Sequence, residues 1–550
     1  MSEEMSEENS ELTNETSDFQ REELRKEELD KAIRAAYLEY AELDRVIYYK
    51  LNKNLSEIAG TRKLTEVVFE LIKWANAEGK LETLFVELYK EKPGNPELKA
   101  IKEKWFPSVS ESDKKSKKKL PWYKFISLRS LRTTLLTSIG ITTLVILTRF
   151  SAVLEPVELL FFDQMMRFPR RDEPDERLLL IQITPNDMEK YGRGQGTSLP
   201  DKTIGELLKI LVDLKPRVIG LDLYREFPTQ DKNLKQLLEK ESNIFAVCKV
   251  AAPESNSSGT SPPEEVPFDR IGFSDFSEDR DHVVRRQLLR MDTKNIDKSP
   301  CGNSKTMDSL SFKLAQKYLS KDKKEYKSTK NSIDLASDNI VLQRLFGSTT
   351  GGYQSMERLL GAYQILLNYR SACRRGNTSV PECSPHKIAQ REMTVKEALE
   401  DKLLNKDSVE DKIVLIGTRI DGIDFLLPTP FSFGEREPRM PGLIMQAQMV
   451  SQLVSAVEDK RPLLRVWSIE YEIGWILLWS LVGGIVAQFC PSNKILILSE
   501  IVAVASLYVI CLIFFTQLQL WIPLIPTAFS LLGTGGFVVV FMRLKAQKLS

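Results

Sequence analysis

Histidine is nearly absent from this chain: among its 550 residues there are two, His282 and His386. Neither has a metal-ligating residue at a useful spacing, so we expect no metal site. The sequence also lacks a P-loop and a protein-kinase signature, and its glycine run GRGQG at 192–196 does not join a strand directly to a helix as a dinucleotide loop does. The sequence therefore predicts neither an enzyme nor a bound cofactor.

An excess of charge of one sign is missing too. Lysine and arginine number 77 and aspartate and glutamate 76, which gives a formal net charge of +1. Nucleic-acid-binding domains carry a marked basic excess, so we expect no nucleic-acid partner. The start of the chain is acidic and has no apolar core, which argues against a secretory signal peptide and predicts a disordered acidic tail over residues 1–20.

Charged residues are also nearly missing from four apolar segments. The first, Thr133–Thr148, is shorter than the ~20 residues of a typical spanning helix, and taken alone it fits a buried core helix equally well. The lysine-rich run before it and the longer C-terminal segments favour a span. We predict four transmembrane helices, at residues 131–150, 471–491, 495–516 and 521–543, and a tail at 544–550.

Basic residues gather at the ends of these segments. Five lysines lie within Lys114–Lys119, inside a predicted basic linker over residues 107–130. Three more basic residues follow the last segment: Arg543, Lys545 and Lys548. Cytoplasmic flanks of membrane helices are enriched in lysine and arginine, so both termini are predicted to be cytoplasmic in a bacterial plasma (inner) membrane. The lysines either contact the lipid bilayer or form a solvated linker.

Four spans place both termini on one side of the membrane and residues 151–470 on the other, extracytoplasmic side. Arg461 and Arg465 are exceptions to the charge rule, which long translocated domains obey only weakly. Within the spans, Glu500 either reaches the interface, pairs with Lys494 or serves transport. One acid does not make a relay, so a transporter or channel accessory subunit is the alternative function and not the preferred one.

Residues 21–106 have the apolar periodicity of a small bundle of helices. Three blocks in this region resemble, in order, the type-one effector-associated domain of bacteria: Tyr48–Leu55, Val67–Leu84 and Asn95–Ile101. The resemblance implies an all-α, death-fold-like bundle that contacts a related helical domain in a cytoplasmic effector protein. The alternative is a helical linker domain without such a partner.

Residues 151–470 alternate apolar strand patterns with helical ones, which is typical of a parallel α/β sheet. Several blocks resemble the CHASE-two family of extracytoplasmic sensor domains, and these are Glu158–Phe168, Leu178–Thr184, Pro216–Pro228, Gly272–Leu289, Ile365–Arg370, Asp411–Thr418 and Met440–Leu464. The resemblance implies a sensor domain of a bacterial receptor, commonly followed by three spans. Many members continue into an enzyme, whereas this chain ends at Ser550, so the N-terminal bundle is expected to be its cytoplasmic output.

Polar residues follow two of the predicted strands of the sensor domain. They are Asp222, Tyr224 and Arg225 after one strand, and Thr418, Asp421 and Asp424 after another. Ligands of α/β sheets bind beyond the carboxyl ends of strands, so a polar cleft for an extracytoplasmic ligand forms here if the two strands are neighbours. The alternative is that these residues cap helices or pair as ions. An enzyme in this domain is a further rival.

Four of the six cysteines fall in the predicted sensor domain, where disulfides persist: Cys248, Cys301, Cys373 and Cys383. They allow three pairings. Cys373 with Cys383 closes a short loop and is the preferred disulfide, whereas Cys248, at a strand end, best suits a free buried thiol.

Asp163 and Arg167 lie four positions apart just after the first predicted span. They either pair along one helix or couple the sensor domain to the membrane. Taken together, the sequence predicts a multidomain membrane receptor or adaptor that senses an extracytoplasmic signal and recruits a cytoplasmic effector. We expect it to form a homodimer, because a shift between subunits is a simple way to signal across a bilayer.

Overall fold

The computed structural model describes residues 22–549 apart from 52, 61–62, 107–127, 169–171, 195–197, 251–257, 293–299, 302–305, 323–325, 329–332, 336–339, 346–350, 354–361, 375–381, 402, 421–425, 433–438 and 491. The predicted acidic tail at 1–20 and most of the predicted linker at 107–130 lie outside these ranges. The chain divides into two compact units, Met1–Ser127 and Leu128–Ser550, and each is described by itself.

The first unit is a helical bundle, as expected. Its helices are 22–36, α2 (Tyr40–Leu51), α3 (Leu55–Ala59), α4 (Leu64–Ala77), α5 (Leu81–Glu91) and α6 (Pro96–Trp105). They close over one apolar core, in which the rings of Phe85 and Phe106 stack at 4.4 Å. Asn95 caps α6 by accepting hydrogen bonds from the backbone of Glu97 and Leu98, which places Pro96 at the first helical position.

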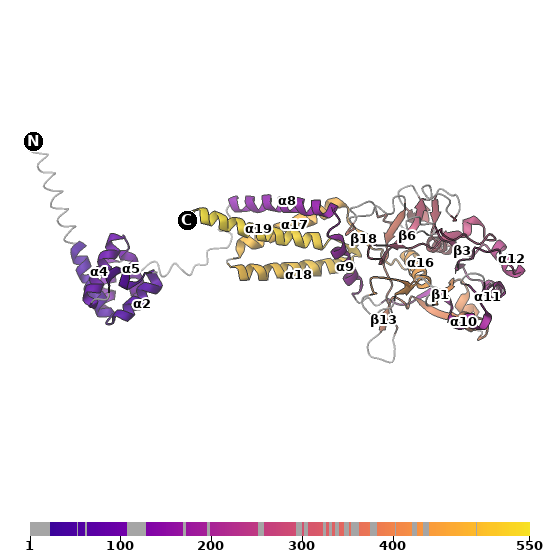
Figure 1. The fold of residues 1–550 in the computed structure, drawn as a ribbon, viewed down its shortest axis with the longest axis horizontal. Coiled ribbons are helices and arrows are strands. Elements are labelled where there is room, and N and C mark those ends of the chain that lie inside the picture. The colour runs from indigo at the N-terminus through magenta and orange to yellow at the C-terminus, as the bar shows by residue number, and fades with distance from the viewer. Residues whose placement is uncertain are drawn as a thin grey trace, which may run out of the picture. The chain divides into compact units, whose positions relative to one another are not determined.

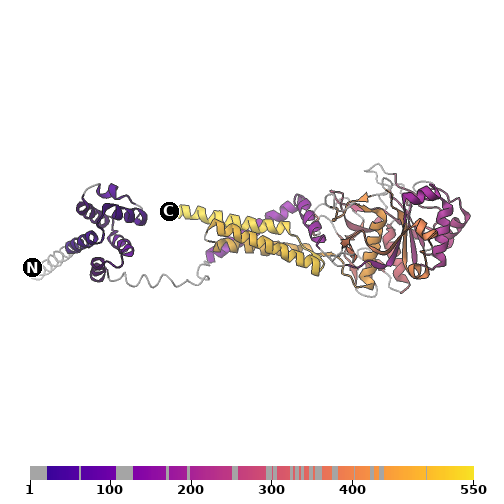
Figure 2. The ribbon, with the colours of Figure 1, turned by 90° about the horizontal axis from the view of Figure 1, so that it is seen from below.

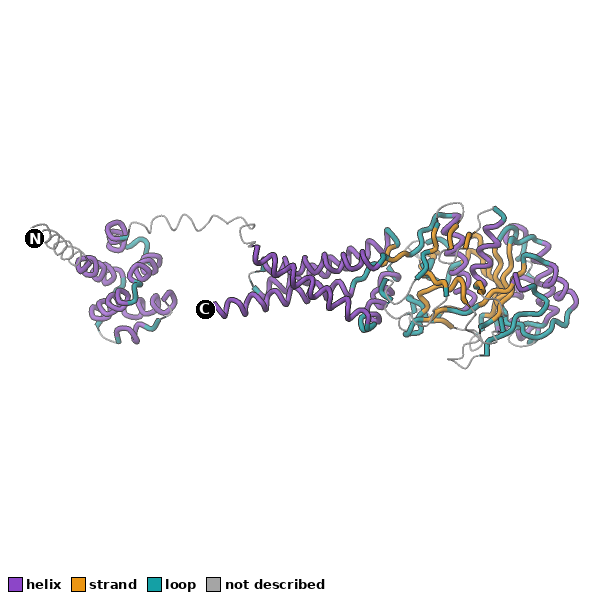
Figure 3. Tube along the Cα trace, turned by 90° about the horizontal axis from the view of Figure 1, so that it is seen from above, coloured by secondary structure: helices purple, strands orange, loops and turns teal. Residues whose placement is uncertain are grey.

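The second unit contains an α/β domain built on a six-stranded sheet in which every pair of neighbours is parallel. Across the sheet the strands run β14 (Ala389–Thr394), β1 (Asp175–Ile183), β15 (Ile413–Thr418), β2 (Val218–Asp222), β3 (Ile244–Cys248) and β4 (Ile271–Phe273). Both faces of the sheet are covered by helices (Figures 1 and 3), which explains why these strands are apolar throughout.

The two faces of the sheet belong to two separate apolar cores, because successive side chains of a strand point to opposite faces. We call the first the far-side core; it contains Leu179 and Ile181 of β1 and is covered by α11 (Asp201–Asp213) and α12 (Lys232–Lys240). We call the second the membrane-side core; it contains Leu178 and Leu180 and is covered by α13 (Leu310–Ser320) and α16 (Gly442–Glu458).

A second, antiparallel sheet lies on the membrane-side core. In it β6 (Val284–Asp292) pairs with β11 (Tyr363–Leu366), β5 (Ser277–Glu278) and β7 (Thr306–Asp308). The buried helix α16 fastens the segment after β11 with side-chain amides: Gln448 donates to the carbonyl of Arg370 and accepts from its N–H, and Gln452 donates to Leu366. These bonds satisfy buried backbone groups at the end of β11 and just after it.

Four helices of the second unit are long and apolar enough to cross a membrane: α8 (Leu128–Phe150), α17 (Ile469–Phe489), α18 (Asn493–Gln517) and α19 (Ile525–Leu549). The last begins at Ile525, after the expected start at 521, because β19 (Leu520–Trp521) and Pro523 precede it. The α/β domain lies at one end of this bundle, whereas α8 begins and α19 ends at the other (Figures 1 and 2).

The bundle is apolar outside and polar inside. Its exposed large apolar side chains are mainly leucine, isoleucine, valine and phenylalanine, whereas buried hydroxyls lie between α8, α17 and α19. Ser480 bonds Thr534 at 2.6 Å, and Thr142 bonds Ser530 at 3.3 Å. Small polar residues between helices and apolar ones outside are typical of packing within lipid. The Oε1 atom of Glu500 is buried against Gly535 and has no hydrogen-bond partner in the described part of the chain.

Candidate functional site

The carboxyl ends of β2 and β15 are neighbours, as the predicted cleft requires: Gly417 pairs with Asp222 across the two parallel strands. The polar residues there are engaged with the protein itself. Arg225 is buried and forms an ion pair with Asp201 at the start of α11, and the hydroxyl of Tyr224 lies 2.8 Å from that of Ser274. Asp421 and Asp424 lie outside the described residues. Arg225 thus has an ion-pair partner within the domain, and a ligand role for all of these residues stays a prediction.

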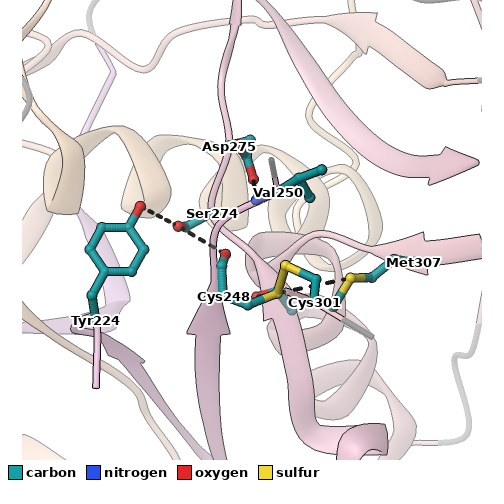
Figure 4. The surroundings of a disulfide bond; sticks show 8 residues. Tyr224, Cys248, Val250, Ser274, Asp275, Cys301 and Met307 are labelled. Atoms are coloured by element: carbon teal, nitrogen blue, oxygen red, sulfur yellow. Dashed lines mark hydrogen bonds between the residues drawn. A yellow bond between two sulfur atoms is a disulfide. The ribbon is translucent and has the colours of Figure 1, made fainter. Parts of the chain in front are cut away.

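A disulfide lies beside this edge of the sheet (Figure 4). It joins Cys248, the last residue of β3, to Cys301, with 5.5 Å between their Cα atoms. The expectation that Cys248 is a free thiol is therefore wrong, and the reason is tertiary: a segment distant in the sequence returns to the end of β3. Next to it, Asp275 accepts a hydrogen bond from the backbone of Val250, and burial raises the pKa of Asp275 to about 6.

The preferred disulfide, Cys373 with Cys383, stays a prediction. The side chains of both residues lie outside the described part of the structure. Their backbones are direct partners in two short antiparallel strands, β12 (Ala372–Arg374) and β13 (Glu382–Ser384). Opposed residues in such a pair have Cα atoms about 4.5–5.5 Å apart, which is within the reach of a disulfide.

A heavily charged buried region lies where the α/β domain meets the bundle, and α9 (Glu155–Met166) forms its centre. Asp163 of α9 accepts two hydrogen bonds from Arg285 of β6, at 2.7 and 2.8 Å. Arg285 also binds Asp279 at 2.8 Å and Asp281 at 2.7 Å. Burial opposes the charge of Arg285, but its bonds to these carboxylates raise its pKa, so it remains a cation.

Asp163 and Arg167, which the sequence predicts either to pair along one helix or to couple the sensor domain to the membrane, both contact the α/β domain. Asp163 does not simply pair along its own helix, because its carboxylate is held by Arg285 from another sheet. Arg167 instead donates to the carbonyl of Pro430. Both residues therefore fasten α9 to the α/β domain, and a role in coupling the sensor domain to the membrane stays a prediction.

The opposite face of α9 is joined to the bundle. Glu158, which is fully buried, accepts hydrogen bonds from the backbone N–H groups of Leu524 at 3.0 Å and Ile525 at 2.7 Å. These groups open the first turn of α19, so a carboxylate from α9 caps a membrane helix and complements its dipole. One turn along α9, the ring of Phe162 contacts that of Trp521 at 4.7 Å.

A second buried pair closes the bundle at this end. Arg149, near the end of α8, binds Glu472 in the first turn of α17 at 2.6 Å, and both side chains are almost fully enclosed. Arg149 also donates to the carbonyl of Gly351, which belongs to the α/β domain. Gly352 beside it has no room for a side chain, since a Cβ there would lie 2.2 Å from Trp521.

We name this assembly the junction and define it by Arg149, Glu158, Asp163, Arg285, Glu472 and Trp521. The sequence pointed to Asp163 alone. A signal for Glu158 was present, because it lies four positions before Phe162 on the apolar face of α9, where an acid must find a buried partner. Arg285 and Trp521 carried no such sign, since their partners are remote in sequence.

The two units match two known families. Residues 140–485 match the CHASE2 domain, which covers more than half of the chain. The chain belongs to the CHASE2 family. Residues 19–106 match Effector-associated domain 1. Comparison with curated proteins and with solved structures gives no match.

Both resemblances inferred from the sequence are therefore confirmed. The CHASE2 domain is an extracytoplasmic sensor domain, and in this chain it comprises the α/β sheet domain and parts of the apolar helices α8 and α17. Together with the effector-associated domain, it makes the chain a membrane signalling protein. Within the described ranges, no group of three His, Cys, Asp or Glu side chains could hold a metal ion.

Proposed function

We propose that this CHASE2 protein is a multi-pass receptor of a bacterial inner membrane that senses an extracytoplasmic condition and recruits a cytoplasmic effector through its effector-associated domain. The observation that carries the proposal is the junction. One apolar core runs from the sheet through α9 and α16 to Phe515 and Leu531 of the bundle, and buried ion pairs accompany it. A sensor must move what it is attached to, and this attachment is rigid.

Transmission through the junction follows from what α9 holds. One face of α9 is bound to β6 through Asp163, and another caps α19 through Glu158. A ligand that shifts β6 therefore displaces α9, and displacing α9 uncaps or reorients the first turn of α19. Ion pairs and close-packed cores move between discrete arrangements and do not deform continuously, so a small shift at the sheet becomes a defined change in the bundle.

The proposed orientation places the α/β domain outside and both termini in the cytoplasm. It is supported by the lysines before α8 and by the position of both bundle termini at the end away from the α/β domain. The test is single-cysteine labelling in a background in which Cys373, Cys383, Cys490 and Cys511 are replaced by serine, so that only the disulfide-bonded Cys248 and Cys301 remain. Lys209→Cys, exposed on α11, should react with an impermeant maleimide on intact cells, and Lys99→Cys, exposed on α6, only after permeabilisation. The reverse pattern would contradict the orientation.

Recruitment is tested with the whole chain in membranes. We expect the full chain, but not a chain lacking residues 1–106, to co-purify a cytoplasmic protein that carries a related helical domain. A captured protein without such a domain, or equal capture by both chains, would contradict homotypic recruitment. Asp163→Asn weakens the junction and leaves the N-terminal effector-associated domain unchanged. The variant should therefore still capture the effector in the resting state, but the response of capture to any extracytoplasmic stimulus should change.

The proposal includes no catalytic step, and the chain is proposed to act as a homodimer. The transporter alternative is less well supported, because the polar residues described inside the bundle are mainly hydroxyls that bond one another. Crosslinking in membranes that gives only the monomer would contradict the dimer.

A further inference from the structure

A basic pocket lies on the surface of the α/β domain beside the junction. It has a volume of about 430 Å³ and is lined by Lys460, Arg461 and Arg465 together with the apolar side chains of Ile340, Val341 and Leu463. The residues described around it include three cations and no carboxylate. Arg461 and Arg465 are also the residues that depart from the charge rule for membrane proteins. A bound anion would explain why cations occur at these positions.

The three cations are not equally available to a ligand. Arg461 is held in place, since it donates to the carbonyls of Asn368 and Tyr369 and lies 3.3 Å from Asp172. Lys460 and Arg465 are exposed, and among the described residues neither side chain has a hydrogen bond or ion pair. Two cations are thus free to bind an anion, while the third fixes the base of the pocket.

The backbone under Arg465 is fixed from both sides. Arg465 and Val466 form β18, which pairs with β19, and the N–H of Arg465 donates to the carbonyl of Gln519 at 2.8 Å. On the other side, the amide of Gln343 bonds both the N–H and the carbonyl of Val466. A rigid backbone with a free guanidinium is an arrangement suited to binding and not to holding the fold together, because the fold uses only the main chain here.

The height of the pocket relative to the bundle follows from the aromatic residues next to it. Trp467 contacts Trp475 of α17 and Phe514 of α18 at 5.8 and 5.9 Å, and Tyr471 lies exposed one turn into α17. Tryptophan and tyrosine in such positions mark the boundary between hydrocarbon and headgroups. Arg465 lies two residues beyond Trp467, about 7 Å of extended chain, and the headgroup layer is about 5–8 Å deep on each side.

We propose that this pocket binds the phosphate of an anionic phospholipid headgroup. Arg465 and Lys460 contact the phosphate, and Ile340, Val341 and Leu463 contact the glycerol and the start of the acyl chains. A soluble phosphate compound offers the same anion, but the apolar wall and the depth of the site favour a lipid. The inference does not depend on which side of the membrane the α/β domain occupies, nor on the effector.

The test uses the purified full chain in nanodiscs of phosphatidylcholine with a titrated fraction of phosphatidylglycerol, and counts retained lipids by native mass spectrometry. Wild type should retain phosphatidylglycerol in preference to phosphatidylcholine. Lys460→Gln/Arg465→Gln should lower that preference about tenfold, which corresponds to about 1.4 kcal/mol. The matched control, Arg132→Gln/Lys494→Gln, removes the same charge from exposed residues near the other end of α8 and α18 and should leave the preference nearly unchanged.

Two results would overturn the proposal. Equal losses in the two double variants would mean that the binding is general attraction to charge and not a site. Binding of inorganic phosphate or glycerol phosphate that depends on Lys460 and Arg465, without any preference for phosphatidylglycerol, would assign the pocket to a soluble anion and exclude the lipid. Both double variants should keep the wild-type melting temperature, because the four side chains are exposed.

Discussion

The far-side and membrane-side cores of the α/β domain each enclose a buried arginine, and the two arginines are bound in different ways. Arg270, beside the far-side core, donates to four backbone carbonyls of and around the end of α12: Leu238, Glu239, Glu241 and Ile244. Arg285, in the membrane-side core, binds three carboxylates: Asp163, Asp279 and Asp281. Arg270 thus satisfies carbonyls at the C-terminal end of one helix, whereas Arg285 joins separate elements, including α9.

The two kinds of contact constrain the conformation of the domain to different degrees. An apolar core tolerates small rearrangements because its contacts have no direction, whereas a buried ion pair has one good geometry and costs several kcal/mol when one partner is lost. The ion pair that reaches α9 belongs to the membrane-side core, and the bundle is attached there. We therefore expect conformational changes of this domain to reach the bundle through the membrane-side face of the sheet.

Replacing each arginine separately is the strongest way to break this comparison. Arg285→Leu removes the cation that binds the buried Asp163, whereas Asp279 keeps its ion pair with Arg286, so we expect the α/β domain to lose about 3–5 kcal/mol of unfolding free energy. It should also expose Cys511, which is buried in α18 at this end of the bundle, to a thiol reagent. Thermal unfolding in detergent and the labelling rate of Cys511 are the measurements.

Arg270→Leu is the control for that experiment. It leaves backbone carbonyls unpaired and no charge uncompensated, so we expect a loss of about 1–3 kcal/mol with Cys511 still protected. If both variants exposed Cys511 equally, the membrane-side core would have no special connection to the bundle.

The sequence predicted this architecture well where the signal is periodic or charge-free, and poorly where partners are remote. The apolar strand Leu178–Thr184 and the four apolar segments were recognisable because burial on both faces, or in lipid, removes polar residues from a continuous stretch. Arg285 and Cys301 gave no local sign of their partners, since Asp163 and Cys248 lie 122 and 53 positions away in the sequence. The same limit applies to Trp521, whose neighbours come from α9 and from residue 353.

The observed disulfide and the predicted one crosslink different parts of the domain, so their contributions to stability can be compared. Cys248 and Cys301 belong to the far-side core, and β12 and β13 adjoin the segment that α16 holds on the membrane side. We expect mass spectrometry of the denatured, unreduced chain to find two free thiols, Cys490 and Cys511. By chain entropy, Cys248→Ala/Cys301→Ala should cost about 4 kcal/mol and Cys373→Ala/Cys383→Ala about 3 kcal/mol, because the second loop is shorter. Four free thiols would disprove the second bond.

Two glycines of α17 differ in how closely they are packed within the bundle. At Gly483 a Cβ would lie 2.2 Å from the backbone oxygen of Leu531 in α19, so Gly483→Ala should push the helices apart and cost about 2 kcal/mol. At Gly474, on the same helix, nothing lies within 4 Å, and Gly474→Ala should stabilise by up to about 1 kcal/mol through helix propensity. Melting temperatures of the two variants that shift in the same direction would contradict close packing of α17 on α19.

The smallest expected effect concerns Asp275 at the margin of the far-side core. Burial raises its pKa from 3.8 to about 6, against the opposing hydrogen bond from Val250. The folded chain therefore keeps a proton on Asp275 that the unfolded chain has released, so this group's contribution to stability is full below about pH 4 and is lost as the pH rises to about 6. We expect about 1–2 kcal/mol, less than the full shift implies because solvent reaches part of the side chain. The measurement is the melting temperature of wild type minus that of Asp275→Asn between pH 4 and pH 7, which removes the contribution of every other carboxylate. A difference that does not change over this range would mean that Asp275 does not keep a raised pKa in the folded chain.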